Sequence, residues 1–302
     1  MNSVAVVPRE RKLTGAAVGI PPRQMNFTMP EGSPHYFFGD NATATIFFAM
    51  LSGFFPPGEH FFMESVRNFR ERVTDEKLKA EISGFMGQEA IHSREHERLN
   101  DMFAARGIDM SIPEKTVRMG LALLERMPQS TQLAATTFME HFTALLAEQL
   151  LNDEQFRGLV DSEMIKIWQW HALEELEHKS VAYDVYELVG NSQRERLLAF
   201  AVSTAVLLPT LAVSWGWMIA KEGQLGNLRD NAEGMKILFG REGFVTRILP
   251  KMPLFGRKGF HPKKHDTRAL ERTWREKLFG DDGQLVAEFK NRDAVAAAVA
   301  VA

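Results

Sequence analysis

Three side chains near the middle of the chain have types and a spacing that suit metal coordination. His171, Glu175 and His178 lie four and three residues apart, so they share one face of a helix. Apolar residues extend this face in both directions, and the three polar groups therefore point inward. A buried Glu between two His is costly unless it is paired, and one metal ion satisfies all three groups. We expect the neighbouring Glu174, Glu177 and Lys179 to form a solvated face.

A second Glu-x-x-His pair occurs earlier, at Glu89 and His92. It lies on a stripe that is otherwise apolar, apart from His96 one turn later. Two such helices, each preceded by a helix with a further Glu, can hold two metal ions inside a four-helix bundle. The sequence therefore predicts two further carboxylates at the same depth.

The periodicity selects one carboxylate on each of the two preceding helices. Glu59 lies on the stripe of Phe55, Phe62 and Val66, whereas Glu64 lies in line with charged residues. We therefore expect Glu59 to point inward.

Glu140 falls between small residues on the third bundle helix, on the stripe that contains Thr137 and Ala144. A competing face contains His141 and Glu148, which leaves the choice of Glu140 open.

The composition restricts the chemistry. The 302 residues include no cysteine, which excludes thiolate ligands and leaves His and carboxylate for iron, manganese or zinc. The 36 basic and 39 acidic residues give no electrostatic case for a nucleic-acid partner. No apolar run follows the basic residues near the N-terminus, so we expect no secretory signal. The expected location is cytoplasmic, with the inner face of the membrane as an alternative.

The chain divides into four parts. We predict an extended arm over 1–34, a metal-binding helical bundle over 35–190, an apolar and basic segment over 191–265, and a terminal helix with a low-complexity tail over 266–302. Asp40 is the expected cap of the first helix, and Pro56-Pro57-Gly58 is expected to break or kink it. The second bundle helix is expected over 75–106, and the fourth over 153–189 without interruption. The predicted class is all-α, with additional C-terminal helices.

The motifs carry a family resemblance. The ligand order resembles that of the ferritin-like di-iron carboxylate proteins. The texts Phe55-Pro-Pro-Gly-Glu59, Gln88-Glu89-x-x-His92-x-x-x-His96 and His171-x-x-x-Glu175-x-x-His178 resemble a bacterial family described as predicted metal-dependent hydrolases, over about 35–265. The extra His171 is similar to one in the arylamine N-oxygenases.

The resemblance implies a set of metal ligands. Glu59, Glu89 and His92 would hold one ion, and the second would be held by Glu140, His171, Glu175 and His178. The bridging carboxylates would be those of Glu89 and Glu175. His96 and His141 depart from the simplest pattern, and either would orient a ligand or be an additional one.

The segment 197–220 contains no charged residue, which meets the length criterion for a membrane helix. A buried helix packed on the bundle gives the same pattern. Residues 221–264 carry ten basic and four acidic residues, a mixture that suits an anionic lipid surface. Membrane contact and packing on the bundle therefore both remain as alternatives for this segment.

Three functions follow from these patterns. The first hypothesis is a di-iron oxidase or oxygenase that acts on an apolar substrate such as a lipid or fatty acyl chain, with a separate electron donor. The alternative is a dinuclear hydrolase with zinc or manganese, which needs neither dioxygen nor a reductant. The third is metal storage or sensing. The substrate and the oligomeric state, including a homo-oligomer, stay open.

Overall fold

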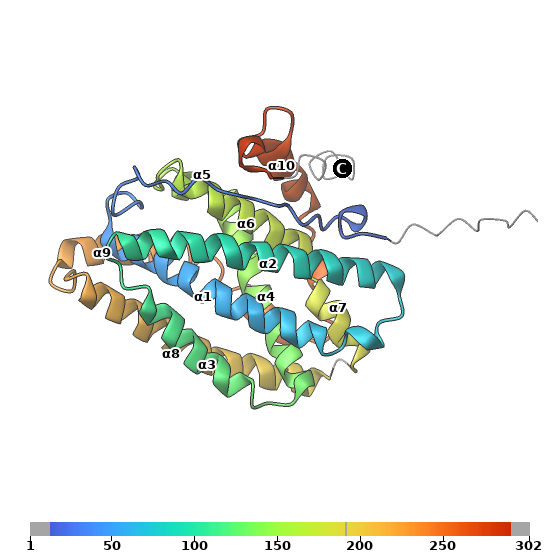
Figure 1. Cartoon of the computed structure of the whole chain (residues 1–302). Helices are drawn as coiled ribbons and strands as arrows, with labels where there is room; N and C mark the ends of the chain where they lie inside the picture. Colours follow the sequence, from blue (N-terminus) through green and yellow to red (C-terminus); the bar gives the residue numbers. More distant parts are fainter. Residues whose placement is uncertain (1–12, 191, 291–302) are drawn as a thin grey trace, which may run out of the picture.

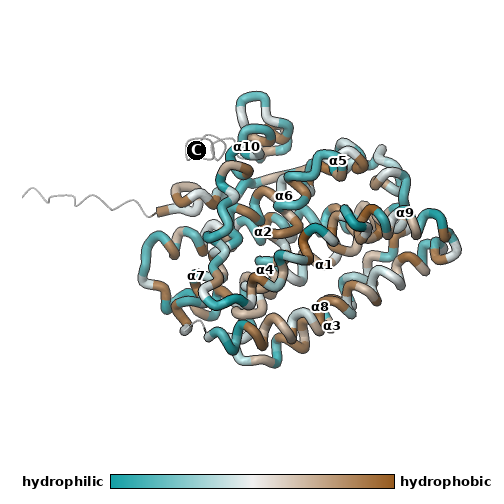
Figure 2. The backbone as a smooth tube through the Cα atoms, turned by 180° about the vertical axis from the view of Figure 1, so that it is seen from behind, coloured by the Kyte–Doolittle hydropathy of each residue, from teal (hydrophilic) through white to brown (hydrophobic). Residues whose placement is uncertain are grey.

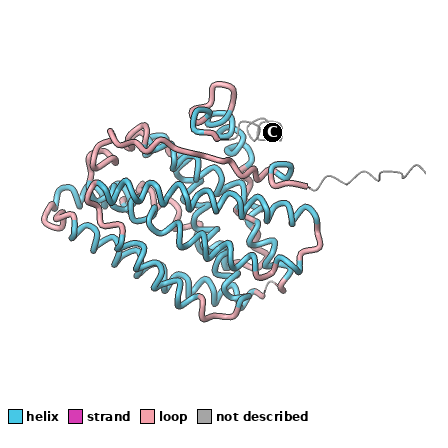
Figure 3. The backbone as a smooth tube through the Cα atoms, in the orientation of Figure 1, coloured by secondary structure: helices cyan, strands magenta, loops and turns pink. Residues whose placement is uncertain are grey.

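The computed structural model describes residues 13–190 and 192–290. Within these ranges every regular element is a helix (Figure 3), and strand-like pairing is limited to two isolated bridges, Met25 with Phe289 and Phe38 with Val160. The predicted all-α class is therefore confirmed. The predicted low-complexity tail from Asp293 lies outside the described residues.

The first long helix, α1 (Ala42–Arg67), runs through the predicted break. Pro56 lacks the N–H that would bind the carbonyl of Ser52, and Asn100 donates to that carbonyl instead, at 3.1 Å. Of the two expectations, the break at the prolines is thus wrong, because a side chain of a neighbouring helix satisfies the carbonyl that Pro56 frees, and the kink stays a prediction. Asn41, and not Asp40, caps α1 by accepting from the Ala44 amide at 2.8 Å.

Four helices surround the interior of the body (Figure 1). α1 packs along α2 (Glu76–Ala105), and α4 (Gln129–Asn152) packs along α6 (Met164–His178). Asp75 caps α2, so the predicted bounds of this helix are correct to within one residue. α3 (Ser111–Leu124) packs against α1 on the outside. In α1, α2, α4 and α6, the helix faces that carry the predicted metal ligands therefore turn toward the same interior.

The predicted continuous helix over 153–189 is wrong. The structure divides it into α5 (Glu154–Arg157), α6 and α7 (Val181–Leu188). Aspartates mark two of the three starts: the Asp153 carboxylate accepts from the Phe156 amide at the predicted start, and the Asp161 carboxylate accepts from the Met164 amide at the start of α6. Periodicity alone did not distinguish these capped starts from one long helix.

The C-terminal helices pack on different sides of the body (Figure 1). α8 (Gln193–Lys221) packs against α3 and α4, α9 (Leu228–Phe239) against α1, and α10 (Arg268–Phe279) against α6. Short 3-10 turns occupy Ala16–Val18, Arg70–Arg72, Met252–Gly256, Pro262–Lys264 and Val286–Glu288.

The segment before α1 runs along the bundle (Figure 1) and is partly buried in it. Arg23 and Met25 are fully inaccessible to solvent. Gly84 of α2 makes this possible, because a Cβ there would lie 2.5 Å from the carbonyl oxygen of Ile20. The segment therefore contributes side chains to the interior of the molecule.

Candidate metal centre

All seven predicted ligands lie together in the interior. Glu59 comes from α1, Glu89 and His92 from α2, Glu140 from α4, and His171, Glu175 and His178 from α6. Each is at most 4% exposed, whereas the side chain of the rejected alternative Glu64 is 43% exposed and pairs with Arg67. The four helices thus converge where the sequence pattern predicted.

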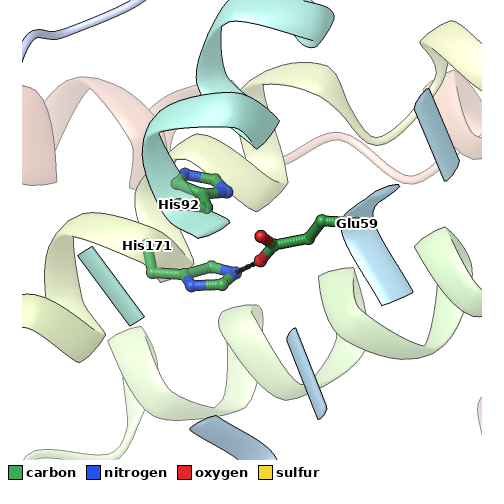
Figure 4. A group of neighbouring side chains, drawn as sticks. All are labelled: Glu59, His92 and His171. Carbon is green, nitrogen blue, oxygen red and sulfur yellow. Dashed lines mark ion pairs between the residues drawn. The ribbon is translucent and has the colours of Figure 1, made fainter. Parts of the chain in front are cut away.

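The donor atoms form three overlapping groups. Within each group the atoms lie within 4.8 Å of one another, as one ion requires. The groups are Glu59, His92 and His171 (Figure 4); Glu89, His92 and Glu175; and Glu89, Glu140 and His178. Glu89 and His92 belong to two groups each, so the groups form one continuous site.

Many polar atoms of this cluster have no hydrogen-bond partner among the described residues, although they are buried. They are Glu59 Oε1, both carboxylate oxygens of Glu89 and of Glu140, Glu175 Oε2, His92 Nδ1 and His178 Nε2. Each such atom costs about 1–3 kcal/mol if it stays unpaired. A folded protein does not carry that sum without a compensating partner, and bound cations are the partner that carboxylates and imidazoles share.

The hydrogen bonds outside the cluster fix the imidazole tautomers of two histidines. His92 Nε2 lies 3.0 Å from Glu174 Oε2 and donates to it. Gln88 uses its amide nitrogen to donate to Glu177 and to the Pro21 carbonyl, so its oxygen accepts from His178 Nδ1 at 2.9 Å. The lone pairs on His92 Nδ1 and His178 Nε2 therefore point into the cluster.

A chain of hydrogen bonds fixes the third imidazole. Ser52 donates its hydroxyl proton to Asn100 at 2.6 Å and so accepts from His96 Nδ1 at 2.9 Å. A neutral His96 must then accept from His171 Nδ1 at 2.8 Å, and burial, which lowers the pKa of His96 well below its usual value, keeps it neutral. The lone pair of His171 Nε2 consequently faces a carboxylate oxygen of Glu175 at 3.0 Å.

The structure places His171 next to donors of both predicted ion sites. Its Nε2 lies 3.9 Å from Glu59 Oε1 and groups with Glu59 and His92, and it lies 3.0 Å from Glu175 Oε1. His178 Nε2 lies 3.6 Å from the same Glu175 oxygen. The predicted assignment of His171 to the ion of Glu140 and His178 therefore stays a prediction.

A buried ionic layer, which the sequence analysis missed, supports the histidines. Arg23 donates to Glu174 and to both oxygens of Glu177 at 2.7 Å, and all three side chains are inaccessible to solvent. The prediction that Glu174 and Glu177 form a solvated face is thus wrong, because the N-terminal segment covers them. The run of glutamates that contains Glu174 and Glu177 does not indicate that Arg23 is their partner.

The two further histidines have different positions. His96 contacts His171 and does not belong to the three groups, so it is placed to orient a ligand. His141 points away from the cluster, and its Nε2 lies 3.3 Å from the Lys251 carbonyl oxygen. It lines a separate cavity of about 370 Å³, where burial lowers its pKa to about 4.

Burial also shifts the pKa values of the carboxylates in the cluster. It raises the pKa of Glu59, Glu89 and Glu140 well above the usual value, and mutual repulsion with the neighbouring carboxylates adds to the effect. In the absence of metal, the site therefore retains protons that cations would displace.

Two narrow apolar cavities reach the cluster. One touches Glu59 and lies between α1, α3, α4 and α8, and the other touches His171 and Glu175. Leu51, Phe55 and Thr143 line both cavities. An apolar molecule in either cavity would lie directly against the donor atoms.

The comparison with protein families agrees with this geometry. Residues 21–266 match the model of a family described as predicted metal-dependent hydrolase. The chain belongs to this family. The matched range spans all seven clustered residues and Arg23. Neither a search of curated proteins nor a search of solved structures gave a match.

Proposed function

We propose that this chain is a dinuclear metal-dependent enzyme that acts on an apolar substrate. The observation that carries the proposal is the convergence of three imidazole lone pairs and six buried, unpartnered carboxylate oxygens on one interior point. The proposed ligands are Glu59, Glu89, His92, Glu140, His171, Glu175 and His178.

The donor set suits two divalent ions. Four carboxylates carry a charge that two divalent cations neutralise, and imidazole with carboxylate suits iron, manganese or zinc. His92, His171 and Glu59 would hold one ion, and Glu140 with His178 the other, with Glu89 and Glu175 between them. The identity of the metal stays a prediction, with iron expected first.

Hydrolysis is the first candidate reaction, because the family to which the chain belongs carries that description. Bound divalent ions would supply Lewis acidity and lower the pKa of a coordinated water. The protein orients the imidazoles through Gln88, Glu174 and His96. The walls formed by Leu51 and Phe55 would exclude bulk water and bind an acyl chain next to Glu59.

Oxidation by dioxygen is the second candidate. It is favoured by a donor set rich in carboxylates inside a helical interior, which is the arrangement of the di-iron proteins. The ferritin-like assignment on which this reading depends stays a prediction. An electron donor would be required, and its identity is open.

One set of measurements tests the proposal and separates the two reactions. The purified protein would be analysed for metal, and turnover of 4-nitrophenyl palmitate would be measured without dioxygen before and after chelation. We expect bound metal and chelator-sensitive hydrolysis, with both lost in Glu140→Gln. The matched control is Glu64→Gln, on the outer side of the same helix as Glu59.

Each other outcome has a distinct meaning. Dioxygen consumption with a reductant, without anaerobic hydrolysis, would replace the first reaction by the second. Bound metal without either reaction would favour metal storage or sensing. A protein that binds no metal after reconstitution with iron, manganese and zinc would contradict both enzymatic proposals.

A further inference from the structure

The outer face of α8 has the reverse of the polarity expected for a helix on a water-soluble surface. It presents large apolar side chains to the exterior, between 43% and 59% exposed: Leu197, Leu198, Leu208, Val213 and Trp217. The inner face buries apolar residues such as Met218 together with Ser203 and Ser214, whose hydroxyl oxygens have no partner among the described residues. A surface helix in water presents a polar outer face instead.

The composition of α8 also indicates that its outer face lies in an apolar environment. Its most apolar window has a mean hydropathy of 2.1, and it is long enough to cross a membrane. Only 17% of that window is buried within the protein, whereas a core helix with the same composition would be mostly buried. The inner face packs against α3 and α4, so α8 stays on the body of the molecule and leaves its outer face uncovered.

Neighbouring elements extend this apolar face and give it a basic rim. α3 lies beside α8 along the same edge (Figures 1 and 2) and adds Met119 and Leu123, which are 72% and 51% exposed. Exposed basic residues lie on α3 or just after it, on α9 and toward the two ends of α8, and two of them pair with a neighbouring Glu (Arg118 with Glu114, Arg229 with Glu233): Arg118, Arg126, Arg194, Lys221, Arg229 and Lys236. An apolar centre with a basic rim complements the acyl region and the headgroups of an anionic leaflet.

The cavity that touches Glu59 lies directly behind this face. Its outer wall is formed by α3 and α8, which cross closely at Gly120. A Cβ at Gly120 would lie 3.0 Å from Val206 Cγ1 and 3.2 Å from Thr210 Oγ1. The cavity measures about 80 Å³, which is well below the roughly 300–1,000 Å³ of ligand pockets. A long-chain ligand would therefore have to part α3 from α8.

We propose that the face of α3 and α8 docks on an anionic lipid leaflet, with α8 parallel to the membrane surface. We further propose that a long-chain acyl substrate passes from the leaflet between α3 and α8 at Gly120 to Glu59. Docking stands independently of the proposed function, whereas the substrate route rests on it. A second copy of the chain is the less favourable occupant, because two basic rims would repel each other and the dimer would close the route.

Vesicle flotation tests the docking. The full-length, metal-loaded protein would be mixed with vesicles of phosphatidylcholine and phosphatidylglycerol at a ratio of about three to one. We expect it to float with them, and the double variant Leu208→Glu, Val213→Glu to lose at least about tenfold in bound fraction. The matched control is Leu159→Glu, an exposed leucine beside α5, on the opposite side of the molecule from α8 (Figure 1).

Two results would overturn docking. One is a wild-type protein that stays in the soluble fraction. The other is a dimer on gel filtration that the double variant splits, because a second copy would then cover the face.

Binding of cis-parinaric acid, a fluorescent long-chain fatty acid, tests the route without measuring turnover. We expect Gly120→Leu to weaken this binding at least about tenfold while metal content and flotation stay unchanged. Gly216→Leu is the control, since no atom lies within 4 Å of a Cβ there. If Gly120→Leu does not fold, Val206→Phe blocks the same crossing.

Wild-type affinity in a folded blocking variant would overturn the route and leave docking intact. A wild-type protein that binds no metal after reconstitution would instead show that the proposed function has failed.

Discussion

Replacing Arg23 by Met tests whether the buried ionic layer supports both the fold and the metal centre. The substitution keeps an apolar stem but removes the guanidinium that contacts Glu174 and Glu177 at 2.7 Å. Breaking a buried ion pair on one side costs about 3–5 kcal/mol. Arg275 still contacts Glu177 at 2.7 Å, so the loss falls mainly on Glu174.

The expected loss in the free energy of unfolding lies at the lower end of this range of about 3–5 kcal/mol. Burial already raises the pKa of Glu174 to about 7, so this carboxylate can take up a proton once Arg23 is gone, which limits the penalty. About 3 kcal/mol, with an unfolding entropy of about 0.6 kcal/mol/K for a chain of this length, lowers the Tm by about 5 °C. A protonated Glu174 also holds His92 less firmly, so metal affinity should fall about 10–100-fold.

Thermal unfolding monitored by circular dichroism at 222 nm, together with metal competition against a chelator, measures both effects. Arg268→Met is the control, because Arg268 pairs with the neighbouring Asp266 at the surface. Adding Glu174→Gln to the Arg23 variant should recover part of the lost stability. A melting temperature within about 1 °C of the wild type, with unchanged metal affinity, would refute the reasoning.

Three further predictions address the site itself. Gln88→Leu removes the acceptor that orients His178 and should weaken metal binding about 10–100-fold, as measured by chelator competition; the variant Gln155→Leu, at an exposed glutamine, should not. Glu59→Gln should lose one of the two ions by elemental analysis, and unchanged occupancy would remove Glu59 from the ligand set. Since burial raises the pKa of three site carboxylates, metal binding should release protons, and affinity should fall as pH is lowered. Calorimetry in two buffers checks this, and a binding enthalpy independent of the buffer would contradict it.

The positions of the inward-facing carboxylates could be predicted from the sequence. Glu59 was distinguished from Glu64 because only Glu59 lies on an apolar stripe, and the structure places Glu59 inside and Glu64 outside. The same logic located Glu89, Glu140 and Glu175. A helix with one buried face must place its residues at a period of 3.6, and this local rule is visible in the sequence.

Other features depended on contacts between distant segments. The continuity of α1 through its prolines depends on Asn100 of another helix. The division of the fourth predicted helix depends on capping at Asp161. The apolar segment 197–220 could equally have been a core helix, and only its packing showed that its outer face is uncovered.

The sequence by itself determined the helical class, the ligand-bearing faces and the depth of the donor atoms, because periodicity and side-chain polarity are local properties. Only the tertiary structure decided which donors meet. It grouped His171 with Glu59 and His92, and it brought Arg23 against Glu174 across 151 positions of sequence. The physical reason is that a side chain's partner is set by the packing of separate segments, which the pattern within one segment does not encode.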